Sequence, residues 1–256
     1  MKILIIGRGW VGKKVLQYLE NKVNVDIADH IEALSILHLY DFVINCAGAT
    51  GIPNVDACEN DKFGALNANA IYPIELYRRC DIHGIRLAHF SSGCIYDGFI
   101  DNVNADPNFF GSIYSISKGI SDSYLKNKAM VFRIRMPFTG INEPKNYLTK
   151  VYNYAKHGKL YDSGLNSLTN LDEAVEVACK LIINNAKDGA YNLVNSGSVT
   201  MRELVDIMKI DNPQWFTEDE FKVATKAARS TCVIPAYEQM SPIREQLEKA
   251  ILSMKK

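Results

Sequence analysis

Tyr114 and Lys118 are the residues of this sequence whose types and spacing most directly suggest chemistry. Four residues apart on a helix, they lie on the same face, one turn from each other. An ammonium group beside a phenol lowers the phenol pKa from ~10 toward neutral pH, which makes the phenol a usable proton donor. We therefore predict that Tyr114 and Lys118 form a proton-transfer pair.

The Tyr-x-x-x-Lys spacing is not specific by itself. The chain holds three more such pairs: Tyr18/Lys22, Tyr124/Lys128 and Tyr152/Lys156. A catalytic pair has to lie near the carboxyl ends of strands, where open parallel sheets bind ligands. Only the pair at 114 and 118 follows a predicted strand, 86–90, with a polar exit, Ser91-Ser92-Gly93-Cys94. A serine hydroxyl there would hydrogen-bond a substrate carbonyl while Tyr114 supplies its proton. The alternative is two surface side chains in weak contact.

A glycine-rich turn, Gly7-Arg8-Gly9-Trp10-Val11-Gly12, lies between a predicted strand at 2–6 and a helix at 13–21. In that context, G-x-G-x-x-G predicts a dinucleotide site, because the glycines allow close backbone approach to a pyrophosphate. The N-terminus of the helix then stabilises the phosphates. The alternative is an ordinary strand-to-helix turn.

Two residues near this turn point to different cofactors. Asp29, near the end of a strand at 23–28, is placed to accept a hydrogen bond from the adenosine ribose, as in NAD sites. Arg8 is placed to pair with the 2′-phosphate of NADP. Each also has a plain alternative, Asp29 as a turn residue and Arg8 as a solvated loop residue. We expect NADP(H) as the preferred cofactor and NAD(H) as the alternative.

Strands and helices alternate through the first half of the chain. Further apolar runs at 42–46, 86–90 and 130–134 predict strands, and the segments 68–80 and 113–126 predict the helices between them. This alternation is typical of an α/β Rossmann-type fold with a doubly wound parallel sheet. We assign residues 1–137 to this dinucleotide-binding domain.

The pattern changes after Pro137. Turn-rich pieces at 139–145 and 161–166 separate predicted helices at 147–157, 171–184 and 201–209. Thr200 and Glu203 have the spacing of a capping box at the start of the last of these helices. We assign residues 138–256 mainly to a smaller, substrate-binding C-terminal lobe that forms one integrated unit with the first domain and exchanges segments with it.

Composition excludes several classes of partner. The 29 Lys and Arg residues balance 29 Asp and Glu residues, so no basic field is present for nucleic acid or a membrane surface. The apolar run at 3–6 is too short for a signal peptide, and no later run approaches a membrane span. The six cysteines lack CxxC pairing and the five histidines show no metal-ligand spacing, so no metal site is predicted. We expect a cytoplasmic protein that binds a small molecule.

These features together resemble the extended short-chain dehydrogenase/reductase family from Met1 to about Leu252. Asn45-Cys46-Ala47-Gly48 is similar to the family's cofactor segment, and Asn69 stands where its structural asparagine is expected. The resemblance implies hydride transfer from NADPH, with Ser92 and Tyr114 on the carbonyl oxygen and Lys118 also on the nicotinamide ribose. The family also forms dimers through the helix of Tyr114, so it implies a homodimer, although the sequence identifies no such interface.

A narrower resemblance is to bifunctional enzymes that make UDP-L-rhamnose from UDP-4-keto-6-deoxy-D-glucose by 3,5-epimerisation and 4-reduction. The similar segments are Gly48-Ala-Thr-Gly-Ile-Pro-Asn-Val-Asp56, Ser92-Gly-Cys-Ile-Tyr96, Arg135-Met-Pro137, Asn146-Tyr-Leu-Thr-Lys150, Asn192-Leu-Val-Asn195 and Ala227-Ala-Arg-Ser230. The resemblance implies substrate contacts by Thr50 and Asn146. The glycine turn is one residue shorter than the family's usual GxxGxxG.

Two reactions at one site need few extra residues. Removing a proton from C3 or C5 of a 4-keto sugar places charge on the C4 oxygen, which Ser92 and Tyr114 already face. The resemblance supplies an acid/base pair in Cys94 and Lys150, the thiol serving as a thiolate base. The alternatives are a small buried hydrophobe and a solvated helix residue. Arg229 is either a phosphate ligand or a structural salt-bridge partner.

Two other functions stay open. One is a 4-reductase without epimerase activity, similar to dTDP-4-dehydrorhamnose reductases, in which Cys94 and Lys150 have no role. The other is a non-catalytic regulatory subunit that keeps the reductase fold, against which the presence of Ser92, Tyr114 and Lys118 argues.

Overall fold

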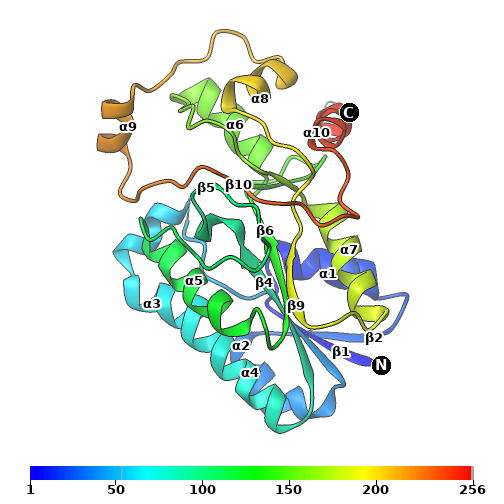
Figure 1. Ribbon diagram of the computed structural model, residues 1–256. Coiled ribbons are helices and arrows are strands. Elements are labelled where there is room, and N and C mark those ends of the chain that lie inside the picture. Colours follow the sequence, from blue (N-terminus) through cyan, green and yellow to red (C-terminus); the bar gives the residue numbers. More distant parts are fainter. Residues whose placement is uncertain (53, 255–256) are drawn as a thin grey trace.

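The computed structural model describes residues 1–52 and 54–254 and is built on a six-stranded sheet (Figure 1). Its strands run in the order β2-β1-β3-β4-β6-β9, and neighbouring strands are parallel throughout. Their bounds are β1 (Lys2–Ile6), β2 (Asn24–Ala28), β3 (Phe42–Asn45), β4 (Arg86–Ser92), β6 (Met130–Ile134) and β9 (Gly189–Asn192). The order reverses beside β1, which is where open α/β sheets bind ligands. The predicted Rossmann-type fold is confirmed.

Helices cover both faces of the sheet (Figure 1). Ile3 and Ile5 of β1 pack on the face of α1 (Trp10–Leu19) and α7 (Leu171–Ile183), whereas Leu4 and Ile6 pack on the face of α2 (His30–Ile36) and α4 (Tyr72–Ile82). Because both faces are buried, the strand is a continuous apolar run rather than an alternating one.

The smaller lobe lies beyond the carboxyl ends of the strands (Figure 1). It contains α6 (Tyr147–His157), α8 (Met201–Met208), α9 (Glu218–Ala224) and α10 (Ile243–Met254). Two short parallel pairs accompany it, β5 (Gly98–Phe99) with β10 (Cys232–Val233) and β7 (Pro137–Phe138) with β8 (Thr169–Asn170). A separate apolar core joins α6, α8 and α10. Although they follow residue 137, α7 and β9 pack with the large sheet.

Several elements differ in detail from the predicted ones. Helix α1 begins at Trp10 rather than at residue 13, because Gly9 with extended backbone is already its N-cap. The predicted helix at 68–80 is divided among α3 (Lys62–Leu66), a π-helical turn η3 (Asn67–Ile71) and α4. Strand β9 and helix α10 were not predicted. Strand β9 is a short segment, and its pairing with β6 decides its conformation. The Thr200/Glu203 capping box is confirmed.

A buried ion pair ties helix α5 (Ile113–Leu125) to strand β6. Arg133 donates from Nε and Nη2 to the two carboxylate oxygens of Asp122 at 2.9 and 2.6 Å, and both side chains are 0% exposed. Ser91 of β4 donates to the same carboxylate at 2.7 Å. The helix that carries Tyr114 and Lys118 is therefore held to two central strands.

Neither a bilayer-crossing helix nor a metal cluster is found in the described ranges. None of their helices combines the length and apolar character that crossing a membrane needs. Those ranges also contain no group of three or more His, Cys, Asp or Glu residues placed to hold a metal ion.

Replacing Asp122 by Asn is expected to lower the free energy of unfolding by about 3–5 kcal/mol, because the guanidinium of Arg133 would stay buried without a counter-charge. Chemical denaturation measures the loss. The matched control is Glu75→Gln, which removes the exposed ion pair with Arg79 and should cost less than about 1 kcal/mol. Equal losses in the two variants would contradict the role assigned to the buried pair.

Candidate active site

The glycine turn forms a cradle at the carboxyl end of β1. Gly7 has a φ of +101°, and a Cβ on it would lie 2.8 Å from the backbone N of Ala47. A Cβ on Gly12 would lie 1.9 Å from the carbonyl O of Gly7, whereas nothing lies within 4 Å of that position on Gly9. No side chain caps α1, so its first N–H groups are available to a ligand. This geometry fits the pyrophosphate of a dinucleotide.

Trp10 and Val11 are half-buried and pack against the core beneath α1. What these two predicted residues offer a cofactor is therefore backbone N–H groups.

Arg8 and Asp29 meet at one corner of the cradle. Asp29 caps α2, its Oδ1 accepting from Ile31 N and Glu32 N at 2.9 Å each, and these backbone N–H groups lower the pKa of its carboxyl. Arg8 lies 3.7 Å from the carboxylate of Glu32, and both side chains are exposed. The structure thus brings both predicted cofactor selectors to the same place, with Asp29 also serving as a helix cap.

Asn45 and Asn69 shape the segment that follows β3. Asn45 Oδ1 accepts from Ala47 N at 3.0 Å, and Asn69 holds Ala49 by two hydrogen bonds of 2.9 Å, one to its N–H and one to its carbonyl. A Cβ on Gly48 would lie 2.9 Å from Asn69 Oδ1 and 3.1 Å from Lys118 Nζ. The bare backbone of Gly48 is what allows Lys118 to approach this segment.

Asn69 itself lies in the π-helical turn η3 and also donates to Ser117 of α5 at 3.3 Å. Single π-turns inside helices frequently mark functional sites, since the extra residue redirects side chains. Here the turn directs the buried amide of Asn69 toward the predicted cofactor segment.

Tyr114 and Lys118 are both buried on α5, which begins at the N-cap Ser112. Lys118 Nζ donates to the carbonyl of Phe90 at 3.2 Å, and burial lowers its pKa to about 8. The predicted lowering of the Tyr114 pKa is wrong for this structure. Burial and the neighbouring Cys94 raise it, because desolvation of the phenolate outweighs nearby positive charge. A raised pKa keeps the phenol protonated, as a proton donor has to be.

Two of the remaining Tyr/Lys pairs make a different contact. The ammonium groups of Lys22 and Lys128 lie over the rings of Tyr18 and Tyr124, at 3.7 and 4.6 Å from the ring centroids. In each pair the lysine follows the end of the helix that carries the tyrosine, α1 or α5, and the contact is a cation–π interaction.

Ser92 and Cys94 lie next to Tyr114 at the exit of β4. Ser92 is buried, its Oγ accepts from Cys94 N at 3.1 Å, and its hydrogen bonding counters the rise of the Tyr114 pKa. Cys94 is half-buried, and its Sγ lies 3.4 Å from Nη1 of Arg135. Phenol, hydroxyl and thiol thus share one small region. Arg135 was not predicted as a site residue, although it opens the matched segment Arg135-Met-Pro137.

Helix α6 contributes the next side chains. Tyr147 is within electrostatic reach of Arg135 and Cys94, and burial raises its pKa to about 12. Sequence reasoning missed Tyr147, and its place in Asn146-Tyr-Leu-Thr-Lys150 was the available signal. Lys150, one turn later, is partly buried. Burial lowers its pKa, and the neighbouring positive charge of Lys145 lowers it further. Its shared helix face with Tyr147 directs Lys150 toward the same side of the lobe.

Three predicted substrate-binding residues have surroundings that differ from one another. Asn146 is 0% exposed, caps α6 through Leu148 N and donates to the carbonyls of Thr139 and Ile141. Arg229 forms a two-pronged ion pair with Asp56 at 2.8 and 2.7 Å, which is the structural alternative stated for it. Thr50 is exposed beside the cofactor segment.

Pro53, part of the segment Gly48–Asp56 that is similar to the bifunctional enzymes, lies outside the described residues.

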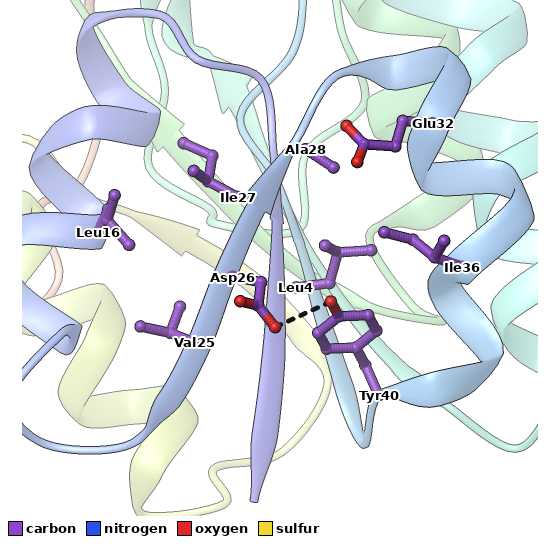
Figure 2. A pocket seen from close by; sticks show the side chains of 9 residues that line it. All are labelled: Leu4, Leu16, Val25, Asp26, Ile27, Ala28, Glu32, Ile36 and Tyr40. Carbon is purple, nitrogen blue, oxygen red and sulfur yellow. Dashed lines mark hydrogen bonds between the residues drawn. The ribbon is translucent and has the colours of Figure 1, made fainter.

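A hollow of about 450 Å³ lies beside β2 and does not include Tyr114 or its neighbours (Figure 2). Leu16, Val25 and Ile27 line one side of the strand, and Tyr40 donates to Asp26 at 2.9 Å on the other (Figure 2). None of the predicted site residues lines this hollow, so it is distinct from the region around Tyr114.

Comparison with known proteins places this fold within the Rossmann class and then within a particular family. Residues 1–236 match the family described as the RmlD substrate binding domain. The chain belongs to this family.

Two curated relatives carry the names of enzymes that act on 4-keto sugars of rhamnose synthesis. An Arabidopsis thaliana bifunctional dTDP-4-dehydrorhamnose 3,5-epimerase/reductase is 32% identical over 78% of this chain and 67% of its own length. A trifunctional UDP-glucose 4,6-dehydratase/UDP-4-keto-6-deoxy-D-glucose 3,5-epimerase/UDP-4-keto-L-rhamnose-reductase from the same plant is 30% identical over 90% of this chain. The chain spans 38% of that relative's length.

A solved structure is similar over the whole fold. The L780 UDP-rhamnose synthase of Acanthamoeba polyphaga mimivirus superposes with a TM-score of 0.88 and 26% identity, covering 99% of each chain.

Gly12→Ala is expected to lower the free energy of unfolding by about 2–3 kcal/mol, because the added methyl meets the carbonyl of Gly7, which is backbone and cannot rotate away. Gly9→Ala is the matched control, since its methyl meets open space and the loss should stay below about 1 kcal/mol. Thermal or denaturant unfolding compares them. A Gly9 variant as unstable as the Gly12 variant would refute this account of the cradle.

Proposed function

We propose that this chain is a nucleotide-sugar 3,5-epimerase/4-reductase that converts UDP-4-keto-6-deoxy-D-glucose to UDP-L-rhamnose. The observation that carries the proposal is the grouping of the Cys94 thiol with Ser92 and Tyr114 at one strand exit. The name of the Arabidopsis bifunctional relative joins the same two activities, which supports the proposal. The names of the trifunctional relative and of the mimivirus structure favour UDP over dTDP on the sugar.

In the reduction, the buried side chains of Ser92 and Tyr114 bind the C4 carbonyl oxygen. A nicotinamide cofactor, held by the cradle of Gly7, Gly9 and Gly12, would supply the hydride to C4. As charge grows on the oxygen, Tyr114 donates its phenolic proton to it, which its raised pKa keeps available. Lys118, whose ammonium lies next to Gly48, would hold the ribose of the nicotinamide.

In the epimerisation, the same oxygen site stabilises an enolate. The Cys94 thiolate removes the proton from C3 or C5, and the electron pair of that C–H bond moves into the enolate, whose charge rests on the C4 oxygen. Lys150 donates a proton to the opposite face of the same carbon, so the configuration inverts. The thiol and the neutral amine return to their starting states by exchanging protons with water.

NADP(H) is the cofactor we propose, with NAD(H) as the alternative. Arg8 supports this choice, because its guanidinium is exposed at the corner of the cradle and its ionic contact with Glu32 is long, at 3.7 Å. Asp29, already capping α2, has one carboxylate oxygen engaged by two backbone N–H groups.

The first test is a substrate panel. Purified protein with NADPH and UDP-4-keto-6-deoxy-D-glucose should oxidise the cofactor and yield the L-rhamno product by NMR, with the dTDP sugar turned over more slowly. Failure to oxidise NADPH with any keto-deoxy sugar would favour a regulatory subunit.

Cys94→Ser is expected to abolish product from the unepimerised keto sugar. A serine hydroxyl is a much weaker acid than a thiol, so it does not ionise to the anion that would remove the proton. The variant should still reduce the already epimerised sugar. NADPH consumption with each of the two sugars distinguishes the steps. Wild-type turnover of the unepimerised sugar by Cys94→Ser would reduce the assignment to a simple 4-reductase.

The pH dependence of reduction should follow Lys118. Its pKa in the folded protein, about 8, lies below the ordinary value of 10.5, so the ammonium is charged below pH 8 and neutral above it. We expect kcat/KM for the epimerised sugar to be constant below about pH 8 and to fall above it, because kcat/KM reports ionisations of the free enzyme. A profile that rises through pH 8 would show that neutral Lys118 is the active form.

A further inference from the structure

Arg135 is a buried cation in the region around Cys94. It follows β6 and is 1% exposed. Its guanidinium donates to neutral oxygens of three segments: Gly93 O at 3.3 Å, Asn166 Oδ1 at 2.5 Å, and Ser230 Oγ and O at 3.0 and 2.8 Å. It also reaches Cys94 Sγ at 3.4 Å, and its Nε has no hydrogen-bond partner among the described residues. Two of these three segments, those of Gly93 and Ser230, are among the segments similar to the bifunctional enzymes, and both contact this one side chain.

No carboxylate neutralises this charge in the part of the chain that the structure describes. Arg133, two residues earlier, is equally buried and has the paired carboxylate of Asp122. Arg135 forms no ion pair with a described Asp or Glu residue. An isolated charge in a protein interior is costly, so a buried guanidinium that lacks a counter-ion calls for an anion nearby.

The titratable groups around Arg135 leave one candidate for that anion. Burial raises the pKa of Cys232 to about 12 and that of Tyr147 to about 12, in both cases against the influence of Arg135. The Tyr114 pKa is raised as well, so these three groups are neutral at pH 7. Cys94 is the ionisable group that directly contacts the guanidinium.

Asp97 is a carboxylate whose charge helps to raise the pKa of Cys232. It is exposed, accepts from Thr231 N at 2.9 Å and forms no ion pair with Arg135 within the described ranges.

The backbone is shaped to hold Arg135 in this place. Met136 has a φ of +43°, a left-handed conformation that is unfavourable for a side-chain-bearing residue, especially before proline. On the other side, a Cβ on Gly93 would lie 3.3 Å from Cβ of Arg135, so glycine permits the close packing. Strain of this kind persists where the surrounding structure enforces it and clusters at functional sites.

We infer that Arg135 is a positioning residue for epimerisation, and that its guanidinium is the counter-ion of a Cys94 thiolate. The inference rests on the proposed function for its catalytic meaning, although the charge pair can be tested without substrate. The guanidinium holds Sγ ionised before the sugar binds, so the sulfur accepts the proton from C3 or C5. Arg135 itself gives up no proton.

Labelling of Cys94 with iodoacetamide across a pH series, quantified by mass spectrometry of its peptide, tests the charge pair. In Arg135→Gln, which keeps a donor and loses the charge, half-maximal labelling should move to higher pH by at least about one unit. Arg135→Lys keeps the charge and should restore a profile near that of the wild type. Ser230→Ala, the control, removes a neutral partner and should leave the profile in place. Identical profiles for Gln, Lys and wild type would overturn the inference.

A second pair of variants retains Arg135, and so remains informative when the Gln variant does not fold. Cys94→Asp and Cys94→Asn differ only in charge next to the guanidinium. The Asp variant should have a Tm at least about 3 °C above that of the Asn variant at pH 7, because its carboxylate neutralises Arg135. A higher Tm for Asn would mean that the pocket does not favour an anion, and the inference would fail.

Solvent deuterium exchange into C3 and C5 of the keto sugar separates this inference from the proposed function. Exchange by the wild type, with its pH profile displaced in Arg135→Gln in step with labelling, supports both. Exchange with an undisplaced labelling profile rejects the charge pair and keeps the epimerase. Absence of exchange with a displaced labelling profile rejects the epimerase, and with it the catalytic use of a charge pair that still exists.

Discussion

The buried ion pair between Asp122 and Arg133 is the interaction on which the candidate active site depends. It fastens α5 to β6, and Ser91 adds β4 to the same carboxylate. The same core contact therefore fixes the position of Ser92, the next residue of β4, relative to Tyr114 on α5. Because both charges are fully desolvated, either one without the other would be strongly destabilising. The geometry of the site is thus coupled to the stability of the fold.

The two arginines at the end of β6 illustrate different uses of the same residue type. Arg133 is neutralised by a carboxylate and serves the scaffold. Arg135 is surrounded by neutral acceptors and one thiol, so its charge is available to stabilise an anion at the Cys94 sulfur. Their positions differ by two residues, and their partners come from different segments, so tertiary packing assigns them separate roles.

Desolvation sets the electrostatics of the region around Tyr114. It lowers the pKa of Lys118 to about 8 and raises that of the phenol, so at neutral pH the cation and the proton donor are both present. The intuitive picture of a cation simply lowering a neighbouring phenol pKa neglects the cost of burying a phenolate. Burial instead keeps the phenol protonated, so that under the proposed mechanism its proton is released only when charge develops on the carbonyl oxygen.

The sequence by itself determined the Rossmann-type sheet, because apolar periodicity and the Gly7 to Gly12 turn are local signals, and it singled out Tyr114, Lys118 and Ser92 through their order along the chain. It did not reveal β9, whose conformation depends on pairing with β6, or the ion pair of Arg229 with Asp56. Only the tertiary structure decided that buried Arg135 has no carboxylate partner among the described residues. That property of Arg135 arises from segments distant in sequence, since burial and charge neutralisation are set by everything that packs around a residue.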